Sequence, residues 1–356
     1  MYSDKVNKYN FEVGVYRPPS EGGSYSLLIR VTRNCPWNKC EFCSMYKAEK
    51  FERRSPEEVK QDIDSIAAIR DDLRNLSLEL GHKGEITRNV ALALMQKEPW
   101  LGNSHEFAMV FNWLVSGGKT AFLQDANSLF LKTEKLVDIL KHLRQTFPSI
   151  ERVTSYARSK TLARKSLQEL EDIRQAGLDR VHVGLETGDD ELLKKINKGV
   201  TSEEHIIGGQ KAMQAGFQLS EYWMPGLGGQ ALWEAHAQNT ARVLNEINPD
   251  YIRSRPFFPM AGSPLHEAYE SGKLELQSPR GQLIELKQFI EALDFSAKVC
   301  FDHAGNYWRN SSGGLLFSHD YEGYQFPQKK AWLLQRIEEG IEVQEDDTTA
   351  PYLMQL

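Results

Sequence analysis

Strand-like and helix-like segments alternate along residues 24–255, and this alternation constrains the fold more than any other feature of the sequence. The expected strands cover residues 24–31, 119–123, 152–156, 180–185, 217–224 and 251–255. The expected helices, where apolar residues recur at helical spacing, cover residues 57–80, 133–143, 162–175, 203–214 and 232–247. Because strands separated by helices pair in parallel, we predict an α/β fold, a partial (β/α)6 TIM-type barrel. A doubly wound open sheet is the alternative.

The domain organisation follows from where this alternation holds. We predict an irregular N-terminal arm over residues 1–23 and a partial barrel over residues 24–260. Residues 81–118 do not fit the repeat and are rich in aromatic residues, so we expect a helical insertion there. After residue 260 the alternation stops, and we expect residues 261–356 to form a helical and irregular cap.

Three of the chain's four cysteines, Cys35, Cys40 and Cys43, lie on the loop after the first expected strand. Thiolates this close in sequence favour one soft metal centre over disulfides. Iron–sulfur clusters usually take four cysteine ligands, so three local ligands indicate a cluster with one iron left open for chemistry. A closed zinc site or an electron-carrying cluster would need a fourth ligand, and the remaining cysteine, Cys300, is remote in sequence.

Composition limits the partners and the compartment. A formal net charge of −6 and a sequence pI of about 5.9 argue against a protein that coats nucleic acid. No apolar run reaches the length of a membrane span, and the first residues are polar, without the apolar core of a signal peptide. Because cysteine is scarce and clustered, we expect a reducing compartment and a cytoplasmic protein.

The cysteine loop, V-T-R-N-C-P-W-N-K-C-E-F-C, resembles the cluster loop of radical S-adenosylmethionine enzymes. In that family the usual pattern is C-x3-C-x2-C with an aromatic residue before the last cysteine. Here Phe42 holds the aromatic position, and the first gap is four residues instead of three. Residues 183–199, 222–229 and the stretch after Arg253 resemble one branch of the family. That branch includes oxygen-independent coproporphyrinogen oxidase, the elongator-type tRNA-modifying enzymes and the methylthiotransferases, and the resemblance covers residues 24 to about 270.

The resemblance implies a cofactor, a [4Fe-4S] cluster with S-adenosylmethionine, and residues that hold it. Cys35, Cys40 and Cys43 would bind three irons, and the fourth iron would chelate the amino and carboxylate groups of the methionine part. Glu186, which ends the fourth strand, would hydrogen-bond the ribose, although it could instead cap the next helix. Three residues would lie near the adenine: Phe42, Gly226 and Leu227. The glycines at 226–229 also fit a simple turn.

Two more groups of residues are carried over from the resemblance. Gln124, Asp125 and Asn127 stand where the family has a Gly-Gly-Glu stretch for the methionine amino group. Asp125 could supply the acidic partner, but the glycines are missing, and these residues also suit an ordinary turn. Tyr156 and Arg158, after the third strand, stand where the family places a polar residue facing the cofactor.

We therefore expect an enzyme that acts on a small molecule and takes electrons from a donor such as flavodoxin or ferredoxin, without membrane or nucleic-acid partners. The candidate pocket residues are Glu221, Tyr222, Arg253, Arg255, Asp302, His303 and Tyr307. The two arginines could clamp a carboxylate or phosphate, or form surface ion pairs. Cys300 could be a hydrogen-atom donor or a fourth ligand, and we favour a buried thiol without a function. The alternatives are methyl or methylthio transfer, and a non-enzymatic iron–sulfur or zinc protein.

Overall fold

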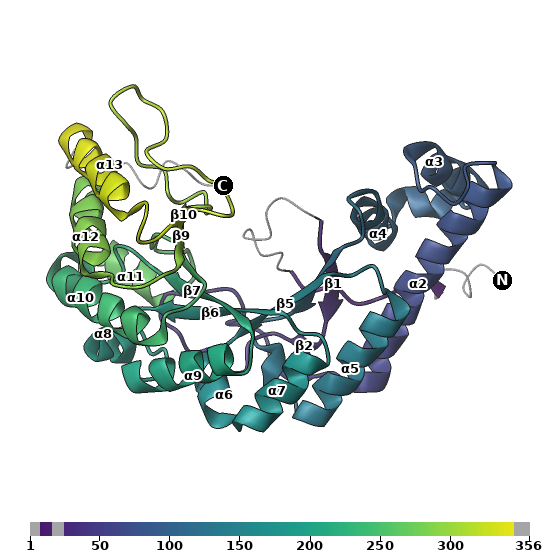
Figure 1. Cartoon of the computed structure of the whole chain (residues 1–356), viewed down its shortest axis with the longest axis horizontal. Helices are drawn as coiled ribbons and strands as arrows, with labels where there is room; N and C mark the ends of the chain where they lie inside the picture. Colours follow the sequence, from purple (N-terminus) through teal and green to yellow (C-terminus); the bar gives the residue numbers. More distant parts are fainter. Residues whose placement is uncertain (1–7, 16–24, 345–356) are drawn as a thin grey trace. The chain divides into compact units, whose positions relative to one another are not determined.

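The computed structural model of the chain describes residues 8–15 and 25–344 (Figure 1). Most of the predicted arm, residues 1–7 and 16–23, lies outside the described residues, as does the end of the predicted cap, residues 345–356. The chain divides into two units. The first comprises residues 1–34, 51–156 and 171–180, and the second comprises residues 35–50, 157–170 and 181–356.

Three parallel strands form the centre of the first unit. β4 (Thr120–Gln124) lies between β1 (Leu27–Arg30) and β5 (Arg152–Ala157), with parallel pairing on both sides. Nearly every residue of the three strands is at least partly buried, as expected for strands covered on both faces. β2 (Thr32–Arg33) and β3 (Glu52–Arg53) form a separate antiparallel pair.

The long helix α2 (Pro56–Glu79) follows β3. It begins at Ser55, whose side chain accepts a hydrogen bond from the backbone N–H of Glu58, while the Glu58 carboxylate accepts one from the N–H of Ser55. It lies beside α5 (Thr133–Thr146), as Figure 1 shows. The predicted insertion is helical, with α3 (Arg88–Lys97), η1 (Pro99–Asn103) and α4 (His105–Val115). The remaining helices here are η2 (Ser128–Phe130) and the second half of α7 (Leu167–Gln175), from residue 171 on.

The second unit carries the strands in the order β6, β7, β8, β9 and β10. Their bounds are Arg180–Glu186, Gln218–Trp223, Tyr251–Ser254, Lys298–Cys300 and Tyr324–Gln325. The pairs β7–β8 and β8–β9 are parallel, and β9–β10 is antiparallel. The helices are α6 (Ser159–Arg164), α8 (Asp190–Lys195), α9 (Ser202–Gln214), α10 (Gly229–Ile247), α11 (Pro264–Glu270), α12 (Pro279–Ala292) and α13 (Lys330–Val343). α10, α12 and α13 lie in a row (Figure 1).

This architecture confirms the predicted fold class. The chain is a mixed α/β protein with mostly parallel strands, consistent with a partial TIM-type fold, and the described strands do not close into a barrel. All six predicted strands are present. In the described ranges no helix combines the length and apolarity needed to cross a bilayer.

Two differences from the sequence-based expectation have local causes. The single helix expected over residues 162–175 is two helices, because Ser166 and Glu169 form a capping box that starts α7. The alternation does not stop at residue 260, because β9 extends the row of parallel strands beside β8. β9 has only three residues, which is too short to leave a clear period-2 pattern.

The contact between α6 and α9 yields a test of the packing. A Cβ on Gly208 of α9 would lie 2.5 Å from the backbone oxygen of Ser159 on α6, so Gly208→Ala must push the helices apart. We expect the free energy of unfolding, measured in urea, to fall by about 1–3 kcal/mol despite the better helix propensity of alanine. Gly102→Ala is the control, because a Cβ there meets nothing within 4 Å. Equal unfolding free energies for the two variants would contradict this packing.

Candidate metal and cofactor site

The cysteine loop belongs to the second unit and holds three free thiols. Cys35, Cys40 and Cys43 are each half-buried. The backbone N–H of Cys43 donates to the carbonyl of Cys40 (3.3 Å), and the N–H of Asn38 lies 3.4 Å from the Cys35 sulfur. Asn38 adopts a left-handed backbone (φ 49°), which asparagine tolerates better than most residues. These contacts and the left-handed Asn38 therefore make the segment that carries the three thiols a tight turn.

The turn at residues 196–199, after α8, anchors this loop. The indole N–H of Trp37 donates to the carbonyl of Asn197 (2.8 Å), and the N–H of Glu41 donates to the carbonyl of Ile196 (2.9 Å). Gly199 has a left-handed backbone (φ 70°), and a Cβ on it would lie 2.2 Å from the Trp37 ring. Only glycine satisfies both requirements at position 199.

Two cations lie beside the thiols. The Arg158 guanidinium stacks over the Trp37 ring at 5.0 Å and donates to the carbonyl of Lys198. The Lys198 ammonium lies 5.4 Å from the centre of the Phe42 ring. Burial raises the pKa of the Cys40 thiol, and the charges of Lys198 and Arg158 oppose that shift. These cations therefore favour thiolate at the loop.

Glu186 ends β6 in an unusual backbone conformation. Its φ is 63°, a left-handed value that is uncommon for a residue with a side chain and is often found at functional sites. The carboxylate pairs with Lys198 at 2.8 Å, and both side chains are about nine-tenths buried. Gly184 makes room for this pair, because a Cβ there would lie 2.3 Å from the Glu186 carboxylate. The loop, the 196–199 turn and the end of β6 thus meet at one ion pair.

A second carboxyl on the neighbouring strand has a very different environment. Glu221 on β7 is 1% exposed, and neither carboxyl oxygen has a hydrogen-bond partner among the described residues. Burial raises its pKa well above the ordinary value; Glu186 adds to the shift and Lys198 opposes it. Burial therefore favours the neutral form of Glu221, whereas Glu186 forms an ion pair with Lys198.

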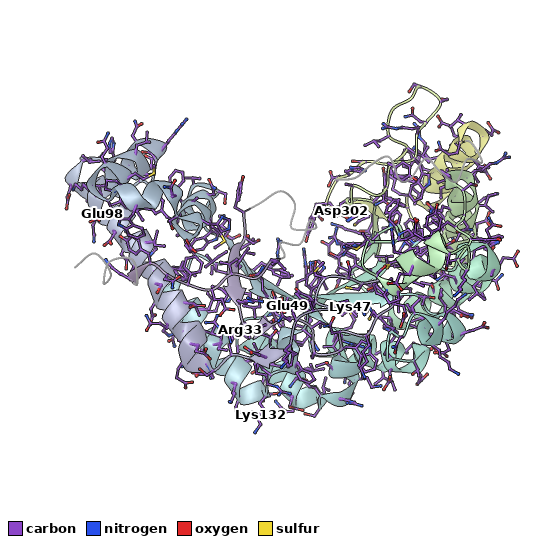
Figure 2. All side chains as sticks on the ribbon, turned by 180° about the vertical axis from the view of Figure 1, so that it is seen from behind. Arg33, Lys47, Glu49, Glu98, Lys132 and Asp302 are labelled. Carbon is purple, nitrogen blue, oxygen red and sulfur yellow. The ribbon has the colours of Figure 1, made fainter. Side chains whose placement is uncertain are left out.

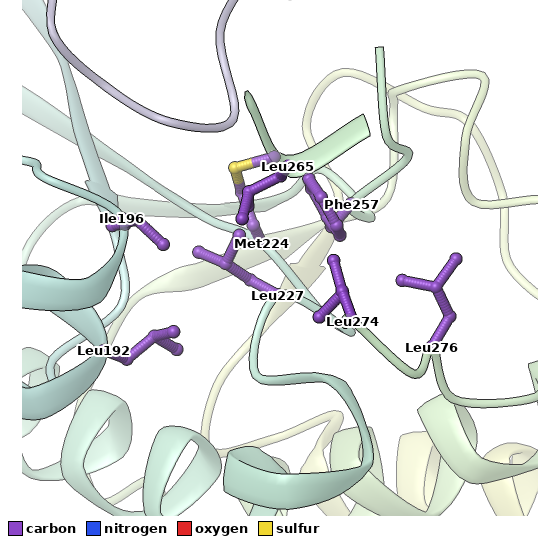
Figure 3. Close-up of a cluster of buried hydrophobic side chains, with 8 residues drawn as sticks. All are labelled: Leu192, Ile196, Met224, Leu227, Phe257, Leu265, Leu274 and Leu276. Carbon is purple, nitrogen blue, oxygen red and sulfur yellow. The ribbon is translucent and has the colours of Figure 1, made fainter. Parts of the chain in front are cut away.

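Leu227 belongs to an apolar cluster (Figure 3), and Phe42 packs against this cluster. The cluster contains Leu192, Ile196, Met224, Leu227, Phe257, Leu265, Leu274 and Leu276. Phe42 is partly buried against it, so one side of its ring packs on the core. Leu227 as a whole is only 2% exposed, and its backbone N–H donates to the carbonyl of Met224 at 3.2 Å. Gly226 has a φ of 83°, and its N–H donates to Glu285 at 3.0 Å.

The other predicted cofactor residues lie in the first unit, where β4 ends. The Gln124 amide makes two hydrogen bonds with the backbone of Gly14, at 2.8 and 3.2 Å. One oxygen of Asp125 accepts from Arg30 and from the N–H of Asn34, and the other has no partner among the described residues. Burial raises the pKa of Asp125, and these two donors oppose the shift. Asn127 is fully buried in the same segment.

The first unit also holds Tyr156, whose ring packs edge-on against Phe122 at 5.1 Å. Of the predicted residues, the structure brings the cysteine loop, Phe42, Arg158 and Glu186 together in the second unit. Gln124, Asp125 and Asn127 gather separately at the end of β4 in the first unit.

The candidate pocket residues near the C-terminus include a buried ion pair. Arg253 is fully buried, and its guanidinium pairs with the carboxylate of Asp302, labelled in Figure 2, at 2.9 Å. This arginine therefore forms neither a surface ion pair nor an unpaired clamp for a ligand. The hydroxyl of Tyr307 is buried without a partner among the described residues. The Cys300 thiol is fully buried, and burial raises its pKa to about 12. The charged groups that act on it are Arg253, Asp302, Glu322 and Lys298, none of them on the cysteine loop.

The chemistry of the second-unit residues fits an iron–sulfur cluster and a charged cofactor. Three free thiols with cations beside them suit an anionic thiolate-bound cluster. Among the described residues no three His, Cys, Asp or Glu side chains already surround a common metal position. The ligand set therefore rests on the thiols and their surroundings.

Lys198 is the site residue that the sequence did not reveal. It lies in the turn Asn197-Lys198-Gly199, and its position beside Phe42 and Glu186 depends on the Trp37–Gly199 contact. The glycine after it was the available signal, since a glycine after a short helix often marks a required left-handed turn.

Comparison with known proteins gives a family match to part of the chain. A profile of the Radical SAM superfamily matches residues 107–237, a range that does not include the cysteine loop. The tRNA-2-methylthio-N(6)-dimethylallyladenosine synthase of Ehrlichia canis is 26% identical over 157 residues, 43% of this chain and 34% of that protein. The heme chaperone HemW of Bacillus subtilis is 26% identical over 173 residues, 48% of this chain and 45% of that protein. The matched regions therefore span between a third and a half of these curated relatives.

Solved structures that match the chain do so at low sequence identity. The radical S-adenosylmethionine methyltransferase TsrM from Kitasatospora setae gives a TM-score of 0.46 at 15% identity, covering 74% of this chain and 43% of that chain. Coproporphyrinogen III oxidase (HemN) from Escherichia coli gives a TM-score of 0.44 at 16% identity, covering 77% of this chain and 54% of that chain.

The contact between Gly199 and Trp37 can be tested by substitution. We expect Gly199→Ala to lower the free energy of unfolding by about 2–4 kcal/mol, because it adds a clash to left-handed strain. The displaced loop should also bind less iron on anaerobic reconstitution. Gly272→Ala is the matched control, since it has the same φ of 70° and a Cβ there meets nothing within 4 Å. Equal iron content and equal unfolding free energy in the two variants would contradict this account of the loop.

Proposed function

Because the chain belongs to the radical S-adenosylmethionine superfamily, we propose that its cysteine loop holds the cluster of an enzyme that acts on a small molecule. The observation that carries the proposal is the ion pair of Glu186 and Lys198, which meets the cysteine loop at Phe42. Thiols, cations and a carboxylate therefore converge within one unit of the chain.

The proteins of this superfamily use a [4Fe-4S] cluster and S-adenosylmethionine. When bound, this pair would supply the reductive cleavage of S-adenosylmethionine, which gives a 5′-deoxyadenosyl radical that can abstract hydrogen from the substrate. Cys35, Cys40 and Cys43 would bind three irons. Arg158 and Lys198 would stabilise the negative charge of the thiolates, and Trp37 would keep the loop in place.

The residues beside the loop suit the polar groups of S-adenosylmethionine. Glu186 ends β6, and its carboxylate would accept the hydroxyls of the ribose. The Lys198 ammonium suits the carboxylate of the methionine part. The Phe42 ring and the backbone at Gly226 and Leu227 would lie along the adenine.

The residues at the end of β4, in the first unit, are a separate part of the proposal. The oxygen of Asp125 that has no partner among the described residues would accept a hydrogen bond from an amino group. Gln124 and Asn127 support that segment, because Gln124 holds Gly14 and Asn127 is buried in the turn. Tyr156 remains a candidate for the ligand-facing side of β5.

The substrate, the electron donor and the compartment are further parts of the proposal. The buried carboxyl of Glu221 has no partner among the described residues, and in its protonated form it would donate a hydrogen bond to a substrate; it lies in the same unit as the cysteine loop. Tyr222, Arg255, His303 and Tyr307 are further substrate-binding candidates. A flavodoxin or ferredoxin would supply the electron, in the cytoplasm.

Methyl or methylthio transfer is the alternative reaction of the same cofactors. The name of the Ehrlichia canis relative favours it. Methylthio transfer usually involves a second cluster, and Cys300 is buried on β9, away from the charges that act on the loop. A closed zinc or iron–sulfur site without chemistry is the remaining alternative, and it would need Cys300 as its fourth ligand.

Cysteine substitutions separate these functions. After anaerobic reconstitution and reduction, we expect the wild type to release 5′-deoxyadenosine from S-adenosylmethionine, and Cys40→Ala to lose at least about 99% of that activity. Cys300→Ala should keep its iron and its cleavage activity, because its thiol contacts backbone carbonyls and no loop cysteine. Iron loss in Cys300→Ala would favour the closed site. A wild type that binds the cluster but never cleaves S-adenosylmethionine would sink the proposal.

A further inference from the structure

Two buried polar side chains from neighbouring helices lie behind the strand ends of the second unit. His236 on α10 and Glu285 on α12 are both fully buried, and His236 Nε2 lies 3.4 Å from Glu285 Oε1. Neither side chain belongs to the cysteine loop or to the ion pair of Glu186 and Lys198. A polar pair in an apolar layer is costly unless its atoms are satisfied. Both His236 nitrogens and Glu285 Oε1 have partners, which indicate the role of the pair, while Glu285 Oε2 has none among the described residues.

His236 joins the ends of β6 and β7. Its Nε2 lies 2.9 Å from the carbonyl of Met224, which can only accept, so Nε2 carries the proton. Its Nδ1 then accepts from the hydroxyl of Thr187 at 2.8 Å. Thr187 directly follows Glu186, and Met224 begins the glycine turn after β7. Burial lowers the pKa of His236 to about 4, which keeps it neutral and preserves this pattern of donors.

Glu285 holds the glycine turn itself. Its Oε1 accepts from the N–H of Gly226 at 3.0 Å, an N–H that no strand neighbour satisfies. The Gln282 side chain, one helical turn earlier on α12, fills the place that a Cβ on Gly226 would take, 2.8 Å away. Burial raises the pKa of Glu285 to about 8, so the carboxyl is neutral at pH 7 and accepts without carrying a charge into the core.

Aromatic stacking fixes α12 in this position. Trp223, the last residue of β7, stacks on Phe289 of α12 with ring centres 3.9 Å apart. Phe289 is one turn after Glu285 on the same helix, so the stack and the hydrogen bond to Gly226 act on adjacent points of β7 and its turn. The C-terminal segment therefore contacts the strand ends directly.

We propose that Glu285 and His236 are positioning residues for the adenosine part of S-adenosylmethionine. They hold the turn after Glu186 and the turn Met224–Gly229 in a fixed relative position, so that the ribose and adenine contacts form together. This inference rests on the proposed function, because it takes those two turns as the adenosine site. It assigns part of that site to the C-terminal segment, which the sequence suggested was only a cap.

The test uses S-adenosylhomocysteine as the probe, with binding to the full-length, anaerobically reconstituted protein measured by titration calorimetry. Glu285→Leu leaves the Gly226 N–H without its acceptor, and we expect its Kd to rise at least about tenfold. Glu285→Gln keeps a neutral acceptor of the same shape and should stay within about twofold of the wild type. In cleavage assays the leucine variant should raise KM for S-adenosylmethionine more than it lowers kcat.

The controls separate positioning from simple structural support. Glu291→Leu, on an exposed part of α12, should bind like the wild type. Thr187→Val removes the hydroxyl that donates to His236 with little change of shape, and its Kd should rise at least about threefold, which keeps the test open if Glu285→Leu fails to fold.

Each result bears on the inference. Wild-type affinity in folded Glu285→Leu and in Thr187→Val would overturn it, as would an equal loss of affinity in Glu285→Gln and Glu285→Leu. A wild type that neither binds the probe nor cleaves S-adenosylmethionine would instead overturn the proposed function, and this inference with it.

Discussion

The ion pair of Glu186 and Lys198 is the interaction on which the rest of the candidate site depends. It joins the end of β6 to the turn that anchors the cysteine loop, with both side chains almost withdrawn from water. A buried pair of this kind adds little net stability, but breaking it leaves one charge unpaired. Gly184 and Gly199 supply the space that the pair and the loop require. These two glycines therefore determine where the Glu186–Lys198 pair and the cysteine loop can lie.

The fold explains why these groups meet. Parallel strands present their carboxyl ends at one edge, and loops there carry function in TIM-type folds. In the second unit that edge carries the left-handed Glu186, the glycine turn after Met224 and the buried carboxyl of Glu221. α10 and α12 support the same edge from behind through His236 and Glu285. Hydrogen bonds from the helices α10 and α12 to the turns at this edge therefore support the site.

Much of this could be predicted because it is local in sequence. The strands follow from apolar runs, and the thiols and Glu186 stand in recognisable motifs. Gly199 marks the turn that carries Lys198, but the place of Lys198 in the site depends on a contact between Trp37 and Gly199 across more than 150 residues, which local patterns do not show. The buried pairing of Arg253 with Asp302 also depends on a distant strand, β9, which is too short to show a pattern. The hydrogen bonds between Gln124 and Gly14 are likewise long-range.

The most direct test of the central claim is electron paramagnetic resonance of the reduced cluster during titration with S-adenosylmethionine. The account predicts that the wild-type signal shifts on titration and that Lys198→Met needs at least about tenfold more S-adenosylmethionine for the same shift. Lys194→Met, which removes an exposed lysine from the same helix–turn segment, should titrate like the wild type. A Lys198→Met protein that shifts at the wild-type concentration would contradict the account, as would a wild-type cluster whose signal does not respond.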